Sequence, residues 1–190
     1  MSAPPLRDPA LYHREVAELI LVVGHVGAGK TTRAIELASA IGAVRLTPDE
    51  WMMALFGESD PDGKRDVLEG RLVWTAAQIL RSGTSVILDF GLWGRDERAA
   101  LAWLAGTVGA TARTEYLSVD RTTQSARVAA RWQESPHSTW AVTDAQLEEW
   151  RHLLQEPDAR ELAGTYRAEP PDPGGWAPWI ARRWPTALGT

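Results

Sequence analysis

Short apolar runs alternate with segments of helical periodicity along the chain. Leu19–Val23 is continuously apolar, as is typical of a strand buried on both faces. Three further short runs predict strands at 43–46, 85–90 and 114–119. Apolar residues three and four apart predict helices at 30–41, 48–56, 65–81, 96–105, 122–132 and 144–154. Because strands alternate with helices, we expect a parallel sheet covered by helices on both faces, with ligands at the carboxyl ends of its strands.

Capping signals support several of these helix boundaries. Thr47 and Glu50 have the spacing of a capping box, and Thr143 with Gln146 repeats it. Asp120 is placed to cap the helix that follows the fourth strand. The sequence thus predicts three side-chain caps, two of them reciprocal.

The composition changes near the C-terminus. From Glu169 the chain reads EPPDPGGWAPWIARRWP, which is rich in Pro, Gly and Trp. We therefore expect residues 1–168 to form a single domain, with residues 1–10 as a loose N-terminal arm. Residues 169–190 are expected to form an irregular C-terminal extension that is packed on the domain or partly loose.

The overall composition is that of a soluble globular protein, with 44% hydrophobic and 24% charged residues. The net charge of −5 and the pI of about 5.4 do not favour a duplex-binding protein. The absence of cysteine removes disulfides, thiolate nucleophiles and cysteine-ligated metals. The longest apolar stretch is far too short to span a membrane, and the N-terminus lacks a signal-peptide layout. We therefore expect a cytoplasmic enzyme with no membrane partner.

The segment that follows the first strand matches a phosphate-binding loop. Residues 24–31, GHVGAGKT, fit the pattern G-x-x-x-x-G-K-[ST], with an apolar strand before them and a helix after them. Glycines let backbone N–H groups surround phosphate oxygens, the lysine reaches the β- and γ-phosphates, and the threonine hydroxyl binds Mg²⁺. The loop residues expected to bind ATP are Gly24, His25, Val26, Gly27, Ala28, Gly29, Lys30, Thr31 and Thr32. His25 is expected to be a wall residue rather than a catalyst.

Two carboxylates are predicted at the same edge as this loop. Phosphoryl transfer needs a second hold on Mg²⁺, a group that orients the acceptor, and positive charge for the transition state. Asp89 ends the apolar strand SVILDF, which is where a Mg²⁺-linked carboxylate is expected; a loop cap is the alternative. Asp49 lies in the first turn of the helix after the second strand, where it could serve as a general base. A carboxylate that only complements the helix dipole is the alternative for Asp49.

Two arginines are predicted to supply the positive charge. Arg127 and Arg131 are four residues apart on one helix, so their side chains share a face. Arginine binds phosphate in a bidentate manner and keeps its charge. We expect Arg127 to bind ATP and both arginines to act on the transferring phosphoryl group from a lid helix. A solvated basic face is the alternative.

At these residues the sequence resembles a known family. The stretches LILVVGHVGAGKTT, VRLTPDEW, SVILDFGLWGRDER and LSVDRTTQSARVAARW are similar to the small phosphate-loop kinases grouped with zeta toxins, polynucleotide 5′-kinases and antibiotic phosphotransferases. The resemblance covers about residues 19–157. It implies a three-layer α/β phosphate-loop NTPase of the kinase type, with a five-stranded parallel sheet, a helical lid, and ATP with Mg²⁺ as donor. It also implies Asp49 as base and Arg127 and Arg131 as lid arginines.

The acceptor site is the least defined part of the prediction. The resemblance places the segment after the third strand beside the acceptor, and tryptophan can stack on a sugar, a base or an antibiotic ring. The acceptor-binding residues we expect are Asp49, Trp51, Asp89, Trp93 and Arg95. Which of the two aspartates is base and which serves Mg²⁺ stays open at this point.

Three functions compete. The leading one is an ATP-dependent kinase whose acceptor is a hydroxyl of a small molecule such as a nucleoside, a nucleotide-sugar or an antibiotic. A polynucleotide 5′-hydroxyl kinase is the second, although no basic run supplies a channel for the strand. The third is a nucleotide-dependent switch or ATPase with a protein partner, which would hold that partner with its C-terminal extension.

Overall fold

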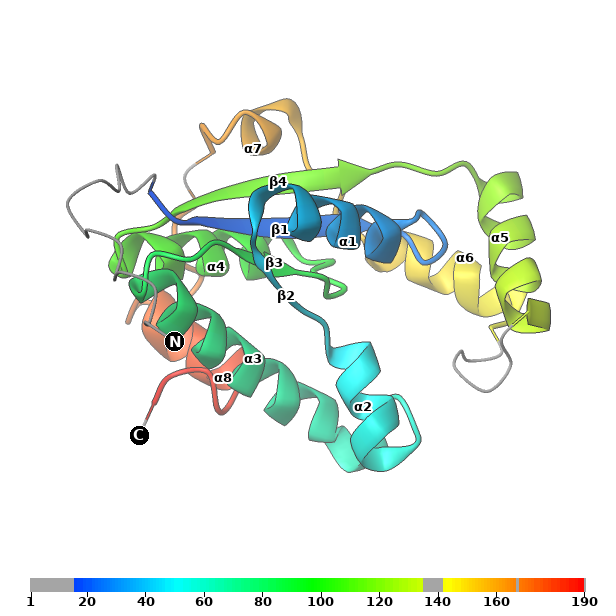
Figure 1. Ribbon diagram of the computed structural model, residues 1–190, viewed down its shortest axis with the longest axis horizontal. Helices are drawn as coiled ribbons and strands as arrows, with labels where there is room; N and C mark the ends of the chain where they lie inside the picture. The colour runs from blue at the N-terminus through cyan, green and yellow to red at the C-terminus, as the bar shows by residue number, and fades with distance from the viewer. Residues whose placement is uncertain (1–15, 135–141, 167, 190) are drawn as a thin grey trace, which may run out of the picture.

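A four-stranded parallel sheet forms the centre of the molecule (Figure 1). The computed structural model describes residues 16–134, 142–166 and 168–189, so the predicted arm at 1–10 lies outside them. The strands stand in the order β2-β3-β1-β4. Their bounds are β1 Glu18–Gly24, β2 Val44–Leu46, β3 Val86–Leu88 and β4 Thr111–Leu117. The parallel sheet that the alternating pattern predicts is confirmed, and its four strands are the four that the apolar runs located.

The prediction of a fifth strand, which the resemblance implied, is wrong for the described residues. The register of β1 with β4 runs without a break from Glu18–Thr111 to Gly24–Leu117, and β4 is the last strand on that side. The segment beyond β4 is helix α7, Ala159–Leu162, which packs against β4 instead. The chain around it contains Pro157, Pro170, Pro171 and Pro173, and proline has no N–H to donate to a strand ladder.

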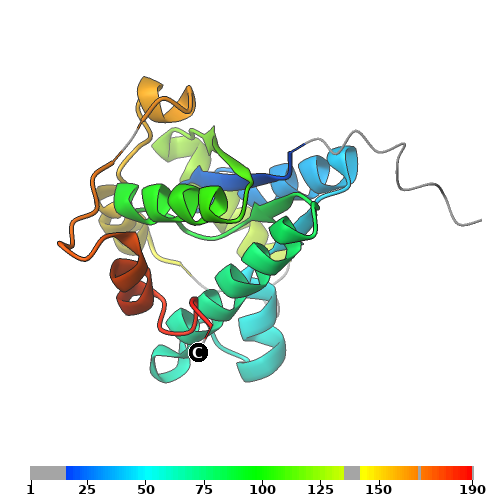
Figure 2. The ribbon, with the colours of Figure 1, turned by 90° about the vertical axis from the view of Figure 1, so that its left-hand side faces the viewer.

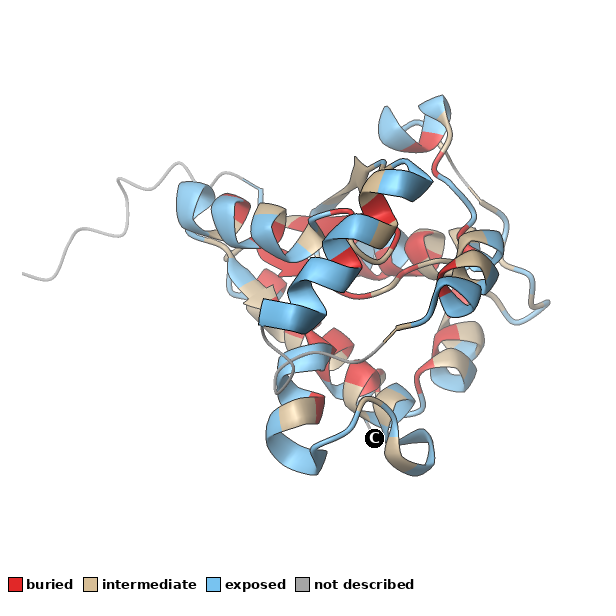
Figure 3. Ribbon diagram, turned by 90° about the vertical axis from the view of Figure 1, so that its right-hand side faces the viewer, coloured by how far each residue is buried: buried red, intermediate tan, exposed pale blue. Residues whose placement is uncertain are grey.

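Helices cover both faces of the sheet, as the pattern predicted (Figure 3). On β1, Leu19, Leu21 and Val23 pack into the larger core with residues of α3 (Lys64–Arg81), α4 (Arg95–Thr107) and α8 (Trp176–Arg183), while Ile20 and Val22 pack with residues of α1 (Lys30–Ile41). This alternation is the period of a strand buried on both sides. The helices are α1 Lys30–Ile41, α2 Pro48–Phe56, α3 Lys64–Arg81, α4 Arg95–Thr107, α5 Arg121–Glu134, α6 Asp144–Leu153, α7 and α8 Trp176–Arg183, with a 3₁₀ turn at Pro61–Gly63.

Two of the three predicted caps form. The Thr143 hydroxyl accepts from the Gln146 amide, and the Gln146 side chain accepts from the Thr143 amide, which completes a capping box. The Asp120 carboxylate accepts from the Thr123 amide at 2.9 Å. The capping box predicted for Thr47 and Glu50 is wrong, because Thr47 makes no side-chain cap bond. The Glu50 carboxylate instead binds an arginine of β2, which is described with the site below.

The C-terminal segment is more ordered than its composition predicted. It contains helix α8, which packs against α4 (Figure 2). Trp176, Ile180 and Trp184 are buried in the larger core, with Trp184 fully inaccessible to solvent. The expectation of an irregular extension is therefore wrong for 176–183, and the tryptophans provide the physical reason, since they bury large apolar rings against the domain.

No helix in the described parts of the chain is long and apolar enough to cross a membrane.

Candidate active site

The phosphate loop joins the end of β1 to the start of α1 and is held in place on two sides. A Cβ atom on Gly24 would lie 2.5 Å from the backbone oxygen of Leu117, so only glycine fits against the end of β4. Gly27 has φ +80°, and a Cβ there would lie 3.0 Å from Val128 Cγ2 of α5. Both glycines are therefore required by close packing, and Gly27 also by its left-handed backbone conformation.

The loop lysine is turned back onto the loop. Lys30 Nζ donates to the backbone oxygens of Gly24 and His25 at 3.0 Å each. Burial lowers the pKa of Lys30, while Asp89 and Asp49 oppose this shift by their negative charge. A partly desolvated ammonium group with two carboxylates in its field is suited to an incoming phosphate, whose oxygens can replace the loop carbonyls as partners.

Helix α5 leans directly on this loop. Gln124 is buried, and its Nε2 donates to the backbone oxygen of Val26 at 3.0 Å. Arg127 Nη1 approaches the backbone oxygen of Gly27 at 3.4 Å. The structure thus brings the predicted lid helix to the phosphate loop, and Gln124 is the contact that the sequence pattern did not single out.

One cleft of about 860 Å³ connects the loop to the carboxyl ends of β2 and β3. Its nucleotide half is lined by Arg127 and Arg131, by residues of α6, and by the phosphate-loop residues Val26, Gly27, Gly29, Lys30, Thr31 and Thr32. The opposite half, which we call the acceptor half, is lined by residues of α2, α3, α4, α8 and the segment after β3. Lys30, both arginines, Asp49 and Asp89 therefore lie around the same cavity, as the sequence predicted.

Asp49 is held by an arginine that the sequence analysis missed. Its carboxylate is 65% exposed and accepts from Arg65 Nη2 at 2.8 Å. Arg65 Nε also donates to Glu69 Oε1 at 3.0 Å, one helical turn along α3. This fork fixes the orientation of the Asp49 carboxylate at the cleft. The spacing of Arg65 and Glu69, four apart on a predicted helix, was the available signal.

Asp89 directly follows β3 and is buried at the floor of the cleft. Its Oδ2 accepts from Arg45 Nη2 at 2.8 Å and from Arg45 Nε at 3.2 Å. Arg45 Nη1 also binds Glu50 at 2.8 Å, which is why Glu50 does not serve the capping box at Thr47. Asp89 is therefore a bound carboxylate shared with β2 rather than a free loop cap.

The donor set around Lys30 fits Mg²⁺ bound together with a triphosphate. Thr31 and Asp89 line the same cleft and offer a hydroxyl and a carboxylate oxygen, which are hard ligands of the kind Mg²⁺ prefers. The described residues contain no group of three or more His, Cys, Asp or Glu that could hold a metal ion by protein ligands alone.

Trp93 enters the cleft from the segment after β3. Its ring lies 6.1 Å from that of Trp150 on α6, with both rings lining the cavity. The preceding residue, Leu92, has φ +45°, an uncommon conformation for leucine. Arg98 Nη1 donates to the backbone oxygens of Leu92 and Trp93, which holds this strained turn and the Trp93 ring in place.

Five predicted residues lie outside the cleft lining, namely Gly24, His25, Ala28, Trp51 and Arg95. Trp51 is 49% exposed on the outer side of α2. Arg95, the first residue of α4, pairs with Asp158 at 3.2 Å and lies over the Tyr166 ring. The His25 side chain is buried behind the phosphate loop, with Nε2 3.7 Å from a carboxylate oxygen of Glu156. Burial and the Arg151 charge lower the pKa of His25, while Glu156 opposes this shift.

The C-terminal helix contributes to the acceptor half. Arg183 lines the cleft and donates to Glu97 and Asp66 at 2.6 Å each. The buried indole of Trp184 donates to Glu69 Oε2 at 3.1 Å. Burial raises the pKa of Glu69, although Arg65, Arg183 and the Trp184 hydrogen bond oppose that shift. A chain of polar contacts thus leads from α8 through Glu69 to Arg65 and the Asp49 carboxylate.

Comparison with known proteins identifies the family. A family model described as AAA domain matches residues 19–157, which is most of the chain. The chain belongs to this AAA domain family. No curated protein shows significant sequence similarity to it.

Solved structures of similar fold include kinases and a protein solved with a bound nucleotide. A candidate kinase from Chloroflexus aurantiacus is 25% identical, with a TM-score of 0.59, covering 70% of this chain and 77% of that one. A gluconokinase from Sinorhizobium meliloti is 16% identical, with a TM-score of 0.54 and 90% and 92% coverage. Kti12 of Chaetomium thermophilum, solved with ADP-AlF3, is 17% identical, with a TM-score of 0.61 and 90% and 100% coverage. The chain therefore has the phosphate-loop kinase fold.

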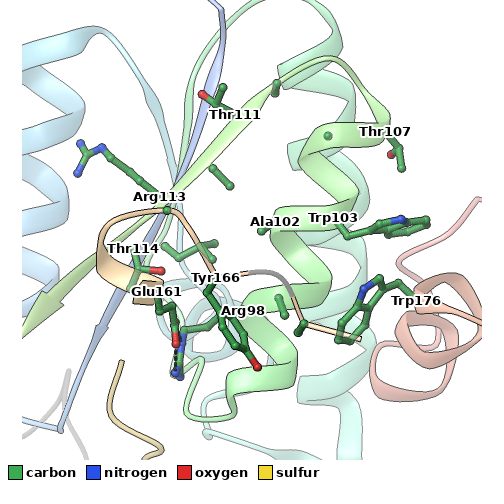
Figure 4. A pocket seen from close by; sticks show the side chains of 17 residues that line it. Arg98, Ala102, Trp103, Thr107, Thr111, Arg113, Thr114, Glu161, Tyr166 and Trp176 are labelled. Carbon is green, nitrogen blue, oxygen red and sulfur yellow. Dashed lines mark hydrogen bonds and ion pairs between the residues drawn. The ribbon is translucent and has the colours of Figure 1, made fainter. Parts of the chain in front are cut away.

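A second cavity of about 700 Å³ lies between α4, β4 and α7 (Figure 4). Small residues and the rings of Trp103, Tyr166 and Trp176 line much of it. Its buried ion pair, Arg98 with Glu161, is satisfied internally, because the guanidinium also binds the backbone oxygen of Gln155 at 2.8 Å. The Lys30 loop and Asp49 do not border this cavity, so we assign the chemistry to the cleft and not to this cavity.

Proposed function

We propose that the protein is an ATP-dependent phosphotransferase that moves the γ-phosphoryl group to a hydroxyl of a small molecule. The observation that carries this proposal is the single cleft with Lys30 and the α5 arginines on one side and the Arg65-bound Asp49 on the other. The proposal places the phosphate donor and the carboxylate base in one cavity, which is the arrangement that phosphoryl transfer requires.

Each group of residues has a separate role in the proposed reaction. The phosphate loop and Lys30 bind the triphosphate. Thr31 and Asp89 would hold the associated Mg²⁺, which would neutralise charge on the phosphates. Arg127 and Arg131 stabilise the charge on the transferring phosphoryl group. Asp49 accepts the proton of the acceptor hydroxyl, and Arg65 keeps its carboxylate oriented. We assign the base to Asp49 because Asp89 is buried and bound by Arg45.

Trp51 and Arg95 do not line the cleft, so the proposed acceptor site omits both of these residues that the sequence suggested. Trp93 takes their place as the aromatic wall, together with Trp150. The acceptor is therefore expected to lie between this pair and the Asp49 carboxylate.

The test is transfer of labelled γ-phosphate from ATP to small-molecule alcohols by the wild type and by Asp49→Asn. We expect the variant to lose about 100-fold or more in product formation while its affinity for ATP is unchanged. Asp62→Asn is the matched control, since Asp62 is exposed and does not line the cleft. ATP hydrolysis without a phosphorylated product from any alcohol would favour the switch or ATPase interpretation instead.

A further inference from the structure

The acceptor half of the cleft is strongly acidic. Its lining carries six carboxylates and only two guanidinium groups, an excess of four negative charges. The carboxylates are Asp49, Asp60, Asp66, Glu69, Asp89 and Glu97, and the cations are Arg65 and Arg183. Counting Arg45, which binds Asp89 from outside the lining, still leaves an excess of three.

Ion pairing within the wall leaves this excess in place. Arg65 is shared between Asp49 and Glu69. Arg183 is shared between Asp66 and Glu97, with Glu69 at 3.5 Å. Each guanidinium therefore serves at least two carboxylates and has no spare charge for a ligand. Burial raises the pKa of Glu69, yet the wall stays negative even when this carboxyl is counted as neutral.

Asp60 offers a carboxylate toward the cleft without a cationic partner among the described residues. It is exposed, and its Oδ1 accepts the backbone N–H of Arg65 at 3.2 Å. Nearby Asp66 is also exposed, and its Oδ1 accepts from Arg183 at 2.6 Å. The two carboxylates flank the start of α3, on the same side of the cleft as Asp49.

The two halves of the cleft therefore select opposite charges. Among the described residues, the cleft-lining cations that pair with no carboxylate are Lys30, Arg127 and Arg131, and all three belong to the nucleotide half, where the triphosphate needs them. An anionic acceptor in the other half would meet like charges, which is a strong means of rejecting a wrong partner. A cationic acceptor would meet complementary charge. The rings of Trp93 and Trp150 at the boundary add a surface that attracts an ammonium group.

We propose that the acceptor is a cationic alcohol, a small molecule that carries a protonated amine as well as the hydroxyl that is phosphorylated, such as an amino sugar or amino alcohol. This inference rests on the proposed phosphotransferase function. The hydroxyl oxygen attacks the γ-phosphorus, the bond from that phosphorus to the β–γ bridging oxygen breaks, and ADP leaves. The hydroxyl proton passes to the Asp49 carboxylate, while the ammonium group of the acceptor is bound by Asp60 and Asp66.

The first experiment separates acceptors by charge. A cell extract freed of macromolecules is fractionated by ion exchange into cationic, neutral and anionic pools, and each pool is incubated with the full-length protein, Mg²⁺ and γ-labelled ATP. We expect labelled product from the cationic pool. Product only from the neutral or the anionic pool would overturn the cationic class while supporting the kinase function. No product from any pool would overturn the proposed function, and this inference with it.

The second experiment tests the carboxylates themselves. Asp60→Asn with Asp66→Asn keeps an oxygen to accept from the Arg65 amide and from Arg183, so the local structure is retained. With glucosamine, or with the purified cationic acceptor if it differs, we expect KM to rise at least tenfold. The KM for ATP should not change. Glu58→Gln, an exposed carboxylate outside the cleft lining, is the control. A double variant with an unchanged acceptor KM would refute the assignment of Asp60 and Asp66.

Discussion

Replacing Trp184 with phenylalanine tests whether the C-terminal helix is part of the folded domain. Trp184 is fully buried, its Nε1 donates to Glu69 Oε2 at 3.1 Å, and its ring lies 6.0 Å from that of Trp179. A hydrogen bond to a charged group contributes about 1.5–3 kcal/mol. The smaller phenyl ring also leaves a gap that costs about 1 kcal/mol. We therefore expect the free energy of unfolding to fall by about 2–4 kcal/mol.

Urea denaturation followed by circular dichroism measures this loss. With a denaturant dependence of about 2 kcal/mol per molar, the midpoint should fall by about 1–2 M. Trp103→Phe is the matched control, because Trp103 is 38% exposed on α4 and should change stability by less than about 0.5 kcal/mol. Equal midpoints for Trp184→Phe and Trp103→Phe would refute the reasoning, and so would a Trp184→Phe midpoint equal to that of the wild type.

Three further predictions follow from single contacts. Arg65→Lys keeps the charge, but a lysine cannot bridge Asp49 and Glu69 at once. We expect kcat for acceptor phosphorylation to fall about tenfold while KM for ATP is unchanged. An equal fall in ATP affinity would argue against a role of Arg65 in orienting Asp49. Gly27→Ala should weaken ATP binding and lower stability by about 1–3 kcal/mol in calorimetry, whereas Gly109→Ala, with φ +76° and open space around it, should lose less. The pKa of His25 is lowered in the folded chain, so on acidification the unfolded chain binds a proton at His25 before the folded chain does. The free energy of unfolding should therefore fall as the pH drops below 6.5. His25→Asn should flatten that part of the curve of unfolding free energy against pH, and an unchanged curve would contradict the lowered pKa.

Short-range sequence patterns were enough to predict much of the nucleotide half of the cleft. The apolar run Leu19–Val23 predicted a strand buried on both faces, and the glycine pattern after it predicted the loop that carries Lys30. Both signals depend on residues adjacent in the chain, so no long-range contact had to be known. The spacing of Arg127 and Arg131 likewise placed both on one helix face, and the structure brings that face to the cleft.

The acceptor half depended on tertiary packing. Nothing in the local sequence shows that Arg65 reaches Asp49, or that Arg45 crosses from β2 to Asp89, because each pair joins two elements whose relative position is set by the core. Thr47 and Glu50 had the spacing of a capping box, but the tertiary contact of Glu50 with Arg45 took the carboxylate away.

The C-terminal segment shows most clearly the difference between what local sequence predicts and what tertiary packing decides. Its prolines and glycines predicted irregular structure, and its tryptophans alone did not say what they would pack against. Only the folded domain supplied an apolar face for α8 and a buried carboxylate, Glu69, for the Trp184 indole. The sequence by itself therefore determined the phosphate loop and the strand order along the chain. The tertiary structure decided which charges surround the acceptor, because charge selectivity depends on side chains that meet only after the core has formed.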